Sequence, residues 1–434
     1  ANIGAAKTEV IATLAAAGLD TAALSDADMV SGTLQAGTGA GYDGVLDALG
    51  QALDTSGTTL AQMTQTVAAA ASGGNPGTEA SAPTSALPAG LLLRPKAENC
   101  AALRSTDYRI IKVAGSNGAE NAPSTALEEM SFDAATLTAS FGADDTMAFT
   151  PNGDCRYTLP EGEAVVSPAG LIVMRHFVGT QGDNLAVGDR GAVRLMIGLP
   201  KQDLAVADLA GEWALLGVDR NPLEAYGGYA TVGATGAVNG FRCWDDGLDV
   251  AEASCTPIDS GYSETLSKNS NGSFSWASGA GESEPWTDTV YAYRAGNGDV
   301  LVVALTHEGE PTFGVKRRKL TLPTAGDEYA NWTMLTNGSL VALPATTVTE
   351  HSVVSVDAAT ETVVRSTSTD GSTAAEQTLV YNSGREGYIA RTAGTGVRPF
   401  SALPMPGFGL TAITMPNTAP APNNNANFGL SVRQ

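Results

Sequence analysis

The sequence predicts a mainly β protein: an N-terminal α-helical segment followed by three tandem antiparallel β-barrel-like units. Apolar residues follow helical spacing only in the first 72 positions, and short alternating or apolar runs come after them. One strand-like ending also recurs, centred on Gly198, Gly314 and Gly429, at intervals of 116 and 115 residues (314 − 198 and 429 − 314). A repeat at a nearly fixed interval indicates copies of one structural unit.

Residues 1–72 are predicted to form short helices. The clearest helical period, i, i+3, i+4, i+7, i+11, is made by Tyr42, Val45, Leu46, Leu49 and Leu53. Helices with one apolar face each predict a small bundle, or a helical cap on a larger body. Residues 73–94 are rich in Gly and Pro and are predicted to be a linker.

The three β units are assigned to residues 95–204, 205–324 and 325–434. Each contains a hairpin-like pair of apolar runs before its glycine-containing end strand. In the second unit the turn is Asn297-Gly298-Asp299, a strong signal for a tight hairpin turn. The units open on Tyr108, Trp213 and Trp332, and each leaves room for about six to eight strands of ordinary length.

The second unit opens on Gly211-Glu212-Trp213 and closes on a strand containing Arg317 and Arg318. This pattern resembles the lipocalins and the wider calycins, in which a Gly-x-Trp on the first strand packs under a basic residue from the last. The resemblance implies a barrel with one end closed by a cation stacked on an indole. The third unit resembles it less closely, since Ala330 replaces the glycine. The residues expected to close barrels are Trp213, Arg317, Arg318, Trp332 and Arg433.

A second resemblance concerns the helical segment. Gly41–Leu49 and Thr58–Thr64 are similar to a segment of bacterial secreted proteins and lipoproteins of uncharacterised function. This resemblance implies export and no particular activity. The chain begins at Ala1, which we interpret as a mature N-terminus after signal removal or as a trimmed end. We expect an extracellular or outer-surface location.

Charge and cysteine usage narrow the function classes. The net charge of −22, from 24 basic and 46 acidic residues, opposes binding to nucleic acid. No apolar run approaches the ~20 residues that a transmembrane helix needs. The four cysteines form two local pairs, Cys100 with Cys155 and Cys243 with Cys255, which favours two disulfides over metal sites; four buried thiols are the alternative.

Catalytic and metal-binding motifs are scarce. His176, His307 and His351 each stand alone, and no nucleophile elbow or zinc-protease motif occurs. We therefore expect a protein that is not an enzyme and has no cofactor. A weak calcium candidate is the acidic run Asp245, Asp246 and Asp249. The aromatic residues Trp276, Trp286, Tyr291 and Tyr293 either line a ligand surface or, more commonly, belong to a β core.

One segment near the C-terminus is both apolar and rich in proline. It is too proline-rich for central strands and too apolar to be exposed, so it either covers its own barrel or packs on a neighbouring molecule. We favour the neighbour, and expect the interface residues to be Phe400, Leu403, Met405, Phe408, Leu410, Ile413 and Met415.

Two functions remain open from the sequence. The first is a non-catalytic surface protein that self-associates, as a homo-oligomer or a polymer, into a filament or layer. The alternative is a lipocalin-like binding module for an apolar ligand or a carbohydrate.

Overall fold

The computed structural model describes most of the chain beyond residue 93. The described residues are 87, 91, 94–114, 128–141, 145–160, 162–178, 192–220, 223–244, 256–258, 264–279, 285–306, 310–335, 347–369, 375–382, 386–391, 399–415 and 427–433. The predicted helical segment 1–72 lies outside them and stays a prediction. Among the described residues no helix is long and apolar enough to cross a membrane.

Unit 1 is a nine-stranded antiparallel sheet of order β6-β5-β4-β3-β11-β10-β9-β8-β7. A separate hairpin, β1 (Lys96–Ala97) and β2 (Cys100–Arg104), precedes it. The strands of the sheet are β3 (Thr106–Ala114), β4 (Glu128–Asp133), β5 (Thr138–Phe141), β6 (Asp145–Ala148), β7 (Thr150–Pro151), β8 (Arg156–Leu159), β9 (Gly162–Val166), β10 (Ile172–Val178) and β11 (Ala192–Pro200).

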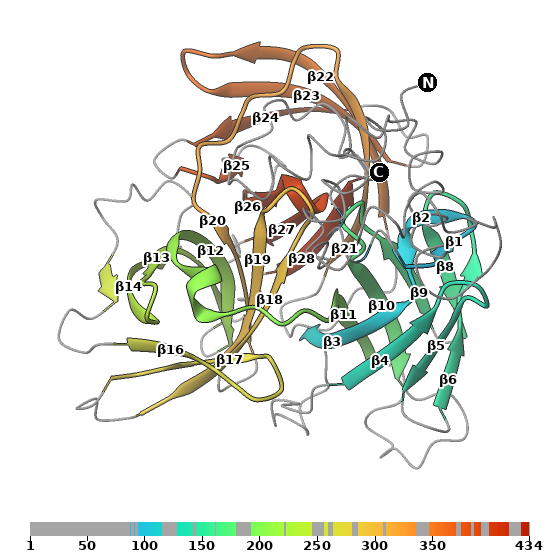
Figure 1. The fold of residues 1–434 in the computed structure, drawn as a ribbon. Coiled ribbons are helices and arrows are strands. Elements are labelled where there is room, and N and C mark those ends of the chain that lie inside the picture. The colour runs from blue at the N-terminus through green and yellow to red at the C-terminus, as the bar shows by residue number, and fades with distance from the viewer. Residues whose placement is uncertain are drawn as a thin grey trace, which may run out of the picture.

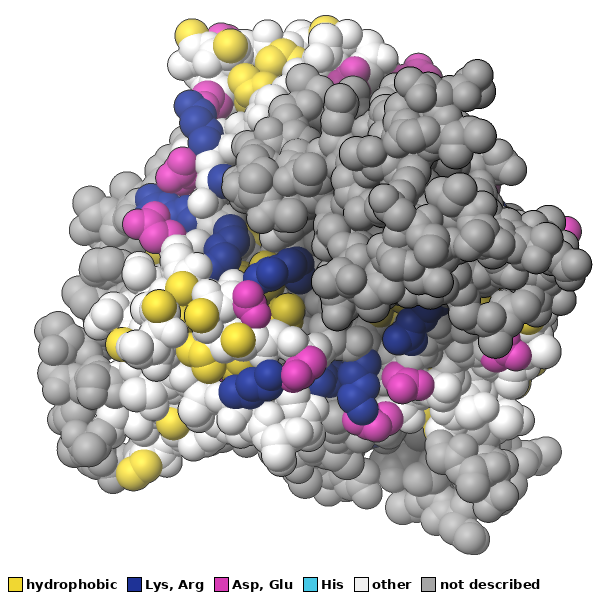
Figure 2. All heavy atoms as spheres, viewed as in Figure 1, with side chains coloured by type: hydrophobic (Ala, Val, Ile, Leu, Met, Phe, Trp, Pro, Cys, Tyr) yellow, Lys and Arg dark blue, Asp and Glu magenta, His cyan; other side chains and the backbone are white. Residues whose placement is uncertain are grey.

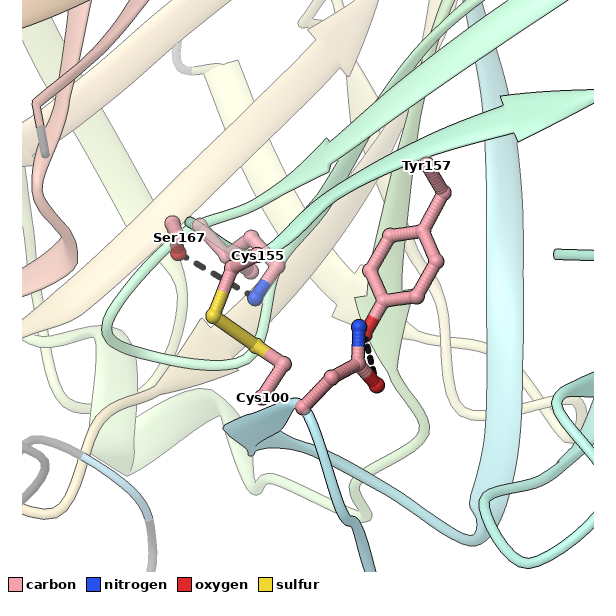
Figure 3. Close-up of a disulfide and its surroundings, with 6 residues drawn as sticks. Cys100, Cys155, Tyr157 and Ser167 are labelled. Carbon is pink, nitrogen blue, oxygen red and sulfur yellow. Dashed lines mark hydrogen bonds between the residues drawn. A yellow bond between two sulfur atoms is a disulfide. The ribbon is translucent and has the colours of Figure 1, made fainter. Parts of the chain in front are cut away.

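The sheet of unit 1 curls around a filled core. Phe149 contacts both Phe132 of β4 and Tyr157 of β8, with ring centroids 5.1 and 5.5 Å apart, so the two halves of the sheet enclose one aromatic cluster. The hairpin adds Leu103 to this cluster. The predicted disulfide between Cys100 and Cys155 is confirmed and ties the hairpin to the turn before β8 (Figure 3).

Unit 2 closes into a ring. Its nine strands run in the order β13-β12-β20-β19-β18-β17-β16-β14-β15, and an additional pairing of β13 with β14 closes eight of them, leaving β15 on the edge of β14. The 3-10 helix η2 (Val206–Leu209) precedes the ring. Its strands are β12 (Gly211–Arg220), β13 (Leu223–Val232), β14 (Ala237–Trp244), β15 (Thr256–Ile258), β16 (Glu264–Lys268), β17 (Phe274–Ala277), β18 (Thr287–Arg294), β19 (Val300–Leu305) and β20 (Pro311–Lys316).

Unit 3 is a closed eight-stranded antiparallel barrel, called barrel 3 below. The 3-10 helix η4 (Pro406–Phe408) joins β26 to β27. The strands are β21 (Glu328–Leu335), β22 (Thr347–Asp357), β23 (Thr362–Thr369), β24 (Ala375–Tyr381), β25 (Ile389–Arg391), β26 (Phe400–Met405), β27 (Leu410–Met415) and β28 (Asn427–Arg433).

The recurring glycine has the same place in all three units. Gly198, Gly314 and Gly429 lie on the last strand of each unit, where that strand pairs with the first long one. A Cβ at Gly314 would lie 2.7 Å from the Leu215 side chain, and one at Gly429 would lie 2.5 Å from the Leu335 side chain. Glycine recurs because a side chain of the opening strand crosses over the closing strand at that point.

The outer faces of the three units meet in one central core. β26 and β27 pack against β12, and β11 packs against β18 (Figure 1). Phe313 stacks on Phe428 with ring centroids 5.7 Å apart, which joins units 2 and 3. The Tyr293 hydroxyl donates a 2.8 Å hydrogen bond to the Ala169 carbonyl, which joins units 2 and 1. The units therefore form one body rather than separate domains on flexible linkers.

Candidate functional site

Along β21 and β27, barrel 3 packs its outer face in the central core and leaves part of its inner face accessible. Along β27, Leu410, Ala412 and Thr414 are buried, whereas Thr411, Ile413 and Met415 are half-exposed. Leu410 and Ala412 belong to the central core, and Ile413 and Met415 pack on the barrel's own inner cluster. Since successive residues of a strand face opposite sides, the accessible face is the interior of the ring.

The opening strand shows the same alternation. Trp332 and Met334 are buried in the central core, whereas Tyr329, Asn331 and Thr333 are half-exposed. Residues directly opposite in an antiparallel ladder share a face, so the strand register identifies the rest of the inner wall. The pairs that follow Tyr329 around the ring include Tyr329↔His351, His351↔Thr367, Arg365↔Gln377, Tyr381↔Ile389, Arg391↔Phe400 and Asn331↔Arg433.

Part of this inner wall is apolar. Its buried members, with one residue that precedes the barrel, are Leu320, Val353, Val363, Leu379, Tyr381, Phe400 and Ala402. Its partly buried members, with Leu322 before the barrel, are Tyr329, Val356, Ile389, Ile413 and Met415. A continuous apolar lining with partial access is the property that small-molecule sites share.

The other part of the inner wall is cationic. The Arg365 Nη1 donates a 3.1 Å hydrogen bond to the Tyr329 hydroxyl, and its Nε and Nη2 donate to Gln377 Oε1 at 3.3 and 3.0 Å. The guanidinium of Arg433 lies 4.7 Å above the Tyr329 ring. Arg391 lies 4.7 Å above the Phe400 ring. Three guanidinium groups therefore share one barrel interior, which we call the arginine cluster.

The positive charge of this cluster acts on its neighbours. Burial, and then the charge of Arg365, lower the pKa of His351 to about 3, so the imidazole is neutral at ordinary pH. Its Nδ1 is 3.0 Å from Thr367 Oγ1, and its ring centroid is 4.9 Å from that of Tyr329. Burial, and then Arg365, also lower the pKa of Arg391.

The described part of the inner wall of barrel 3 carries no carboxylate. None of the described residues that the register places inside barrel 3 is an Asp or a Glu; Glu328, Glu350 and Glu376 lie on the alternate, outward positions. Several described cations elsewhere pair with acids, for instance Lys201 with Glu129 at 2.8 Å. Figure 2 shows such a face, where Lys and Arg side chains form a band with Asp and Glu among them. Arg365, like Arg109 in unit 1, donates hydrogen bonds only to neutral acceptors among the described residues.

The expected barrel-closing residues lie one position away from their predicted partners. Lys316, and not Arg317, lies over the Trp213 ring at 4.2 Å, because Lys316 is the residue opposite Trp213 in the β12–β20 ladder. The guanidinium of Arg317 faces the Tyr229 ring at 4.0 Å, and that of Arg318 makes two 3.0 Å hydrogen bonds to the Asp299 carboxylate.

In barrel 3 the same correction applies. Trp332 pairs with Val432 and faces the central core, whereas Arg433 pairs with Asn331 and faces the interior. The aromatic partner of Arg433 is therefore Tyr329 instead of Trp332.

The apolar, proline-rich segment packs against other parts of the same chain. It forms β26, η4 and β27, and Pro404 lies beyond the part of β26 that pairs with β25, which explains how a strand tolerates it. Four of the expected interface residues belong to the central core: Leu403, Met405, Phe408 and Leu410. The other three belong to the inner wall of barrel 3: Phe400, Ile413 and Met415. The expected contact with a neighbouring molecule does not fit this placement.

The remaining candidates either pack elsewhere in the fold or lie outside the described residues. Tyr291 and Tyr293 belong to the central core, and Trp276 donates its indole N–H to Glu264 at 2.8 Å. His176 lies in β10 and Cys243 in β14, but their side chains are outside the described part. Also outside it are His307, Cys255 and the acidic run Asp245, Asp246 and Asp249. The second disulfide and the calcium candidate therefore stay predictions.

The arginine cluster was not anticipated from the sequence, apart from Arg433. Its signal is present in β23, where Val363, Arg365 and Thr367 occupy alternate positions and so share a face. An arginine on the same strand face as an apolar residue is unusual. The sequence does not tell whether that face points into the barrel, so the strand pairing is needed to interpret it.

No protein-family model matches the chain, and no curated protein matches it in sequence. Among solved structures, the chain is similar to a protein of unknown function from the DUF3598 family of Nostoc punctiforme, at 12% identity and a TM-score of 0.22, over 54% of this chain and 98% of that one. It is also similar to transferrin binding protein B of Haemophilus parasuis, at 7% identity and a TM-score of 0.23, over 76% of each chain. The transferrin binding protein B of Neisseria meningitidis is similar at 9% identity and a TM-score of 0.22, over 71% of this chain and 65% of that one. These scores carry no conclusion, so the site is interpreted from its own geometry.

Proposed function

We propose that the chain is a binding protein that holds a small, largely apolar molecule inside barrel 3. The observation that carries this proposal is the exposure pattern of β21 and β27: Trp332, Met334, Leu410 and Ala412 pack outward in the central core, and the inward residues of both strands keep partial access. Burying apolar ligand surface against such a wall is favourable by roughly 25 cal/mol per Å².

The other two units support this choice by contrast. In unit 1, Tyr108, Phe132 and Tyr157 are almost fully buried inside the curled sheet. In unit 2, Trp213 and Phe274 fill the corresponding space. Such interiors are packed cores, so we propose that units 1 and 2 act as the scaffold that fixes the outer wall of barrel 3.

The site also bears on the alternatives. The apolar, proline-rich segment, which supplied the expected interface residues, packs against other parts of the same chain, so we do not propose self-association as the main function. Binding of this kind needs neither a catalytic group nor a cofactor, and we propose neither. The Cys100–Cys155 disulfide supports an oxidising compartment, and an exported location stays part of the proposal.

A neutral fluorescent probe tests the proposal. Wild-type protein should bind N-phenyl-1-naphthylamine saturably, and Ile413→Trp, which adds bulk to a half-exposed inner position, should abolish that binding. Val354→Trp is the matched control, because Val354 is 48% exposed on the same barrel and should bind as the wild type does. Ile389→Trp, at a second inner position, replaces Ile413→Trp if the latter does not fold. Saturable binding that survives both inner substitutions would contradict the proposal.

A further inference from the structure

We infer that the ligand of barrel 3 is an amphipathic organic anion, with its acidic group bound by Arg365 and Arg433 and its apolar body on the inner wall. This inference rests on the proposed function and names the class of molecule that the same site selects. The acidic group is a carboxylate or a phosphate, since the guanidinium fork fits both.

The first step is the unbalanced charge. Arg365 and Arg433 converge on one residue, Tyr329, the first through a hydrogen bond and the second through stacking. Like charges repel more strongly in a partly buried site than in water. The chain has 46 acidic residues against 24 basic ones, yet among the described inward positions of barrel 3 none is acidic. An anion from outside the chain would relieve this repulsion.

The second step is preorganisation. Gln377 and Tyr329 fix the plane of the Arg365 guanidinium by neutral hydrogen bonds, so the group is oriented without being neutralised. Arg433 is positioned by stacking on Tyr329, and no described residue accepts a hydrogen bond from its side chain. Donors held in place before the ligand arrives lose little entropy on binding.

The third step is the position of the cluster beside the apolar wall. Arg391 stacks on Phe400, and Phe400 belongs to the buried inner cluster with Val363 and Leu379. Tyr329 likewise contacts both guanidinium groups and packs on that cluster. A molecule that reaches the arginines therefore also touches the apolar lining, which favours an amphiphile over a small inorganic anion.

Histidine does not replace the arginines in this role. The imidazole of His351 is buried and uncharged at ordinary pH, and it bonds to the hydroxyl of Thr367. The anion would therefore be held by groups that keep their charge over the whole physiological range.

The test compares probes that share a dodecyl chain and differ in head group, together with one anion that has no chain. Displacement of N-phenyl-1-naphthylamine is measured with dodecanoate, dodecyl phosphate, dodecanol and dodecyltrimethylammonium, and with inorganic phosphate alone. For the wild type we expect dodecanoate or dodecyl phosphate to bind at least about tenfold more tightly than dodecanol. The two anionic arms distinguish a carboxylate from a phosphate ligand.

Variants then assign the preference to the cluster. Arg365→Gln and Arg433→Gln should each reduce the ratio of anion affinity to dodecanol affinity to within about twofold, because each removes one charge-assisted contact. Arg156→Gln, at an ion pair with Asp154 in unit 1, is the matched control and should keep the preference.

The outcomes separate the two proposals. If no probe binds, the proposed function fails. If dodecanol binds as tightly as dodecanoate and dodecyl phosphate, or if both arginine variants keep the preference, barrel 3 binds apolar molecules and the inference is wrong. If inorganic phosphate displaces the probe as well as the anionic amphiphiles do, the requirement for an apolar body is overturned.

Discussion

Arg365 and Arg433 contact the same tyrosine inside barrel 3. The first donates a hydrogen bond to the Tyr329 hydroxyl at 3.1 Å, and the second lies 4.7 Å above the Tyr329 ring. Strands β21, β23 and β28 meet through this one side chain. Tyr329 therefore positions both cations, and changes to it should affect the two contacts separately.

Tyr329→Phe should keep the stacking of Arg433 on the ring and remove the hydroxyl that accepts a hydrogen bond from Arg365. We expect a loss of about 1 kcal/mol in the free energy of unfolding, measured by urea titration. The anion preference of the displacement assay should weaken but persist. Tyr329→Leu removes the ring as well, so it should lower the preference further. Equal effects of the two substitutions would show that the ring does not position Arg433.

His351 should make stability dependent on pH. Its pKa is about 3 in the folded protein and ordinary in the unfolded chain, so the unfolded state takes up a proton first as the pH falls. The stabilisation present above the unfolded pKa of about 6.5 is then lost progressively toward pH 3. Between pH 7 and pH 5 the loss should be at most about 2 kcal/mol.

His351→Gln isolates this effect, because glutamine does not titrate in this range. Urea unfolding at both pH values should show a smaller loss in the variant than in the wild type. An identical pH dependence in the two proteins would mean that His351 titrates normally when folded.

Loss of the disulfide should destabilise unit 1 and leave the site intact. Cys100 and Cys155 close a loop over a separation of 55 residues, so Cys100→Ser with Cys155→Ser should cost about 2–4 kcal/mol. Calorimetry measures this loss. Binding of N-phenyl-1-naphthylamine, measured at a temperature 20 °C below the unfolding transition of the variant, should be unchanged. Weaker probe binding would mean that the hairpin of unit 1 shapes barrel 3.

Phe408 decides between an internal and an intermolecular role for the proline-rich segment. It is 1% exposed, and its ring centroid lies 6.1 Å from that of Tyr293. Phe408→Ala should therefore lower the free energy of unfolding by about 3–5 kcal/mol through the cavity it leaves. Sedimentation should show the same mass for the variant and the wild type. Dissociation of an oligomer without destabilisation would restore the expected interface.

Local signals predict the repeat well, because glycine recurs where one side chain must cross a neighbouring strand. Gly198, Gly314 and Gly429 mark the three closing strands from sequence alone. The spacing does not tell which face of a unit is buried. Leu403 lies on β26, which packs on β12, and Phe408 contacts Tyr293, so both meet core partners that precede them by more than 100 positions in the chain.

The register of the strands explains why the predicted barrel-closing cations are wrong. Side chains of a strand alternate between faces, so a shift of one residue exchanges inside and outside. Trp213 therefore pairs with Lys316 while Arg317 faces Tyr229. The Gly-x-Trp resemblance identifies the right pair of strands, and the exact cation follows from hydrogen-bonded register that a short motif does not specify.

Crystals soaked with ω-bromododecanoate test the central claim most directly, because bromine scatters anomalously and marks the apolar end of the bound molecule. The account predicts a bromine peak inside the ring of β21–β28, with the carboxylate within hydrogen-bonding distance of Arg365 or Arg433. A bromine peak on the outer surface, or a carboxylate that points away from both arginines, would contradict it.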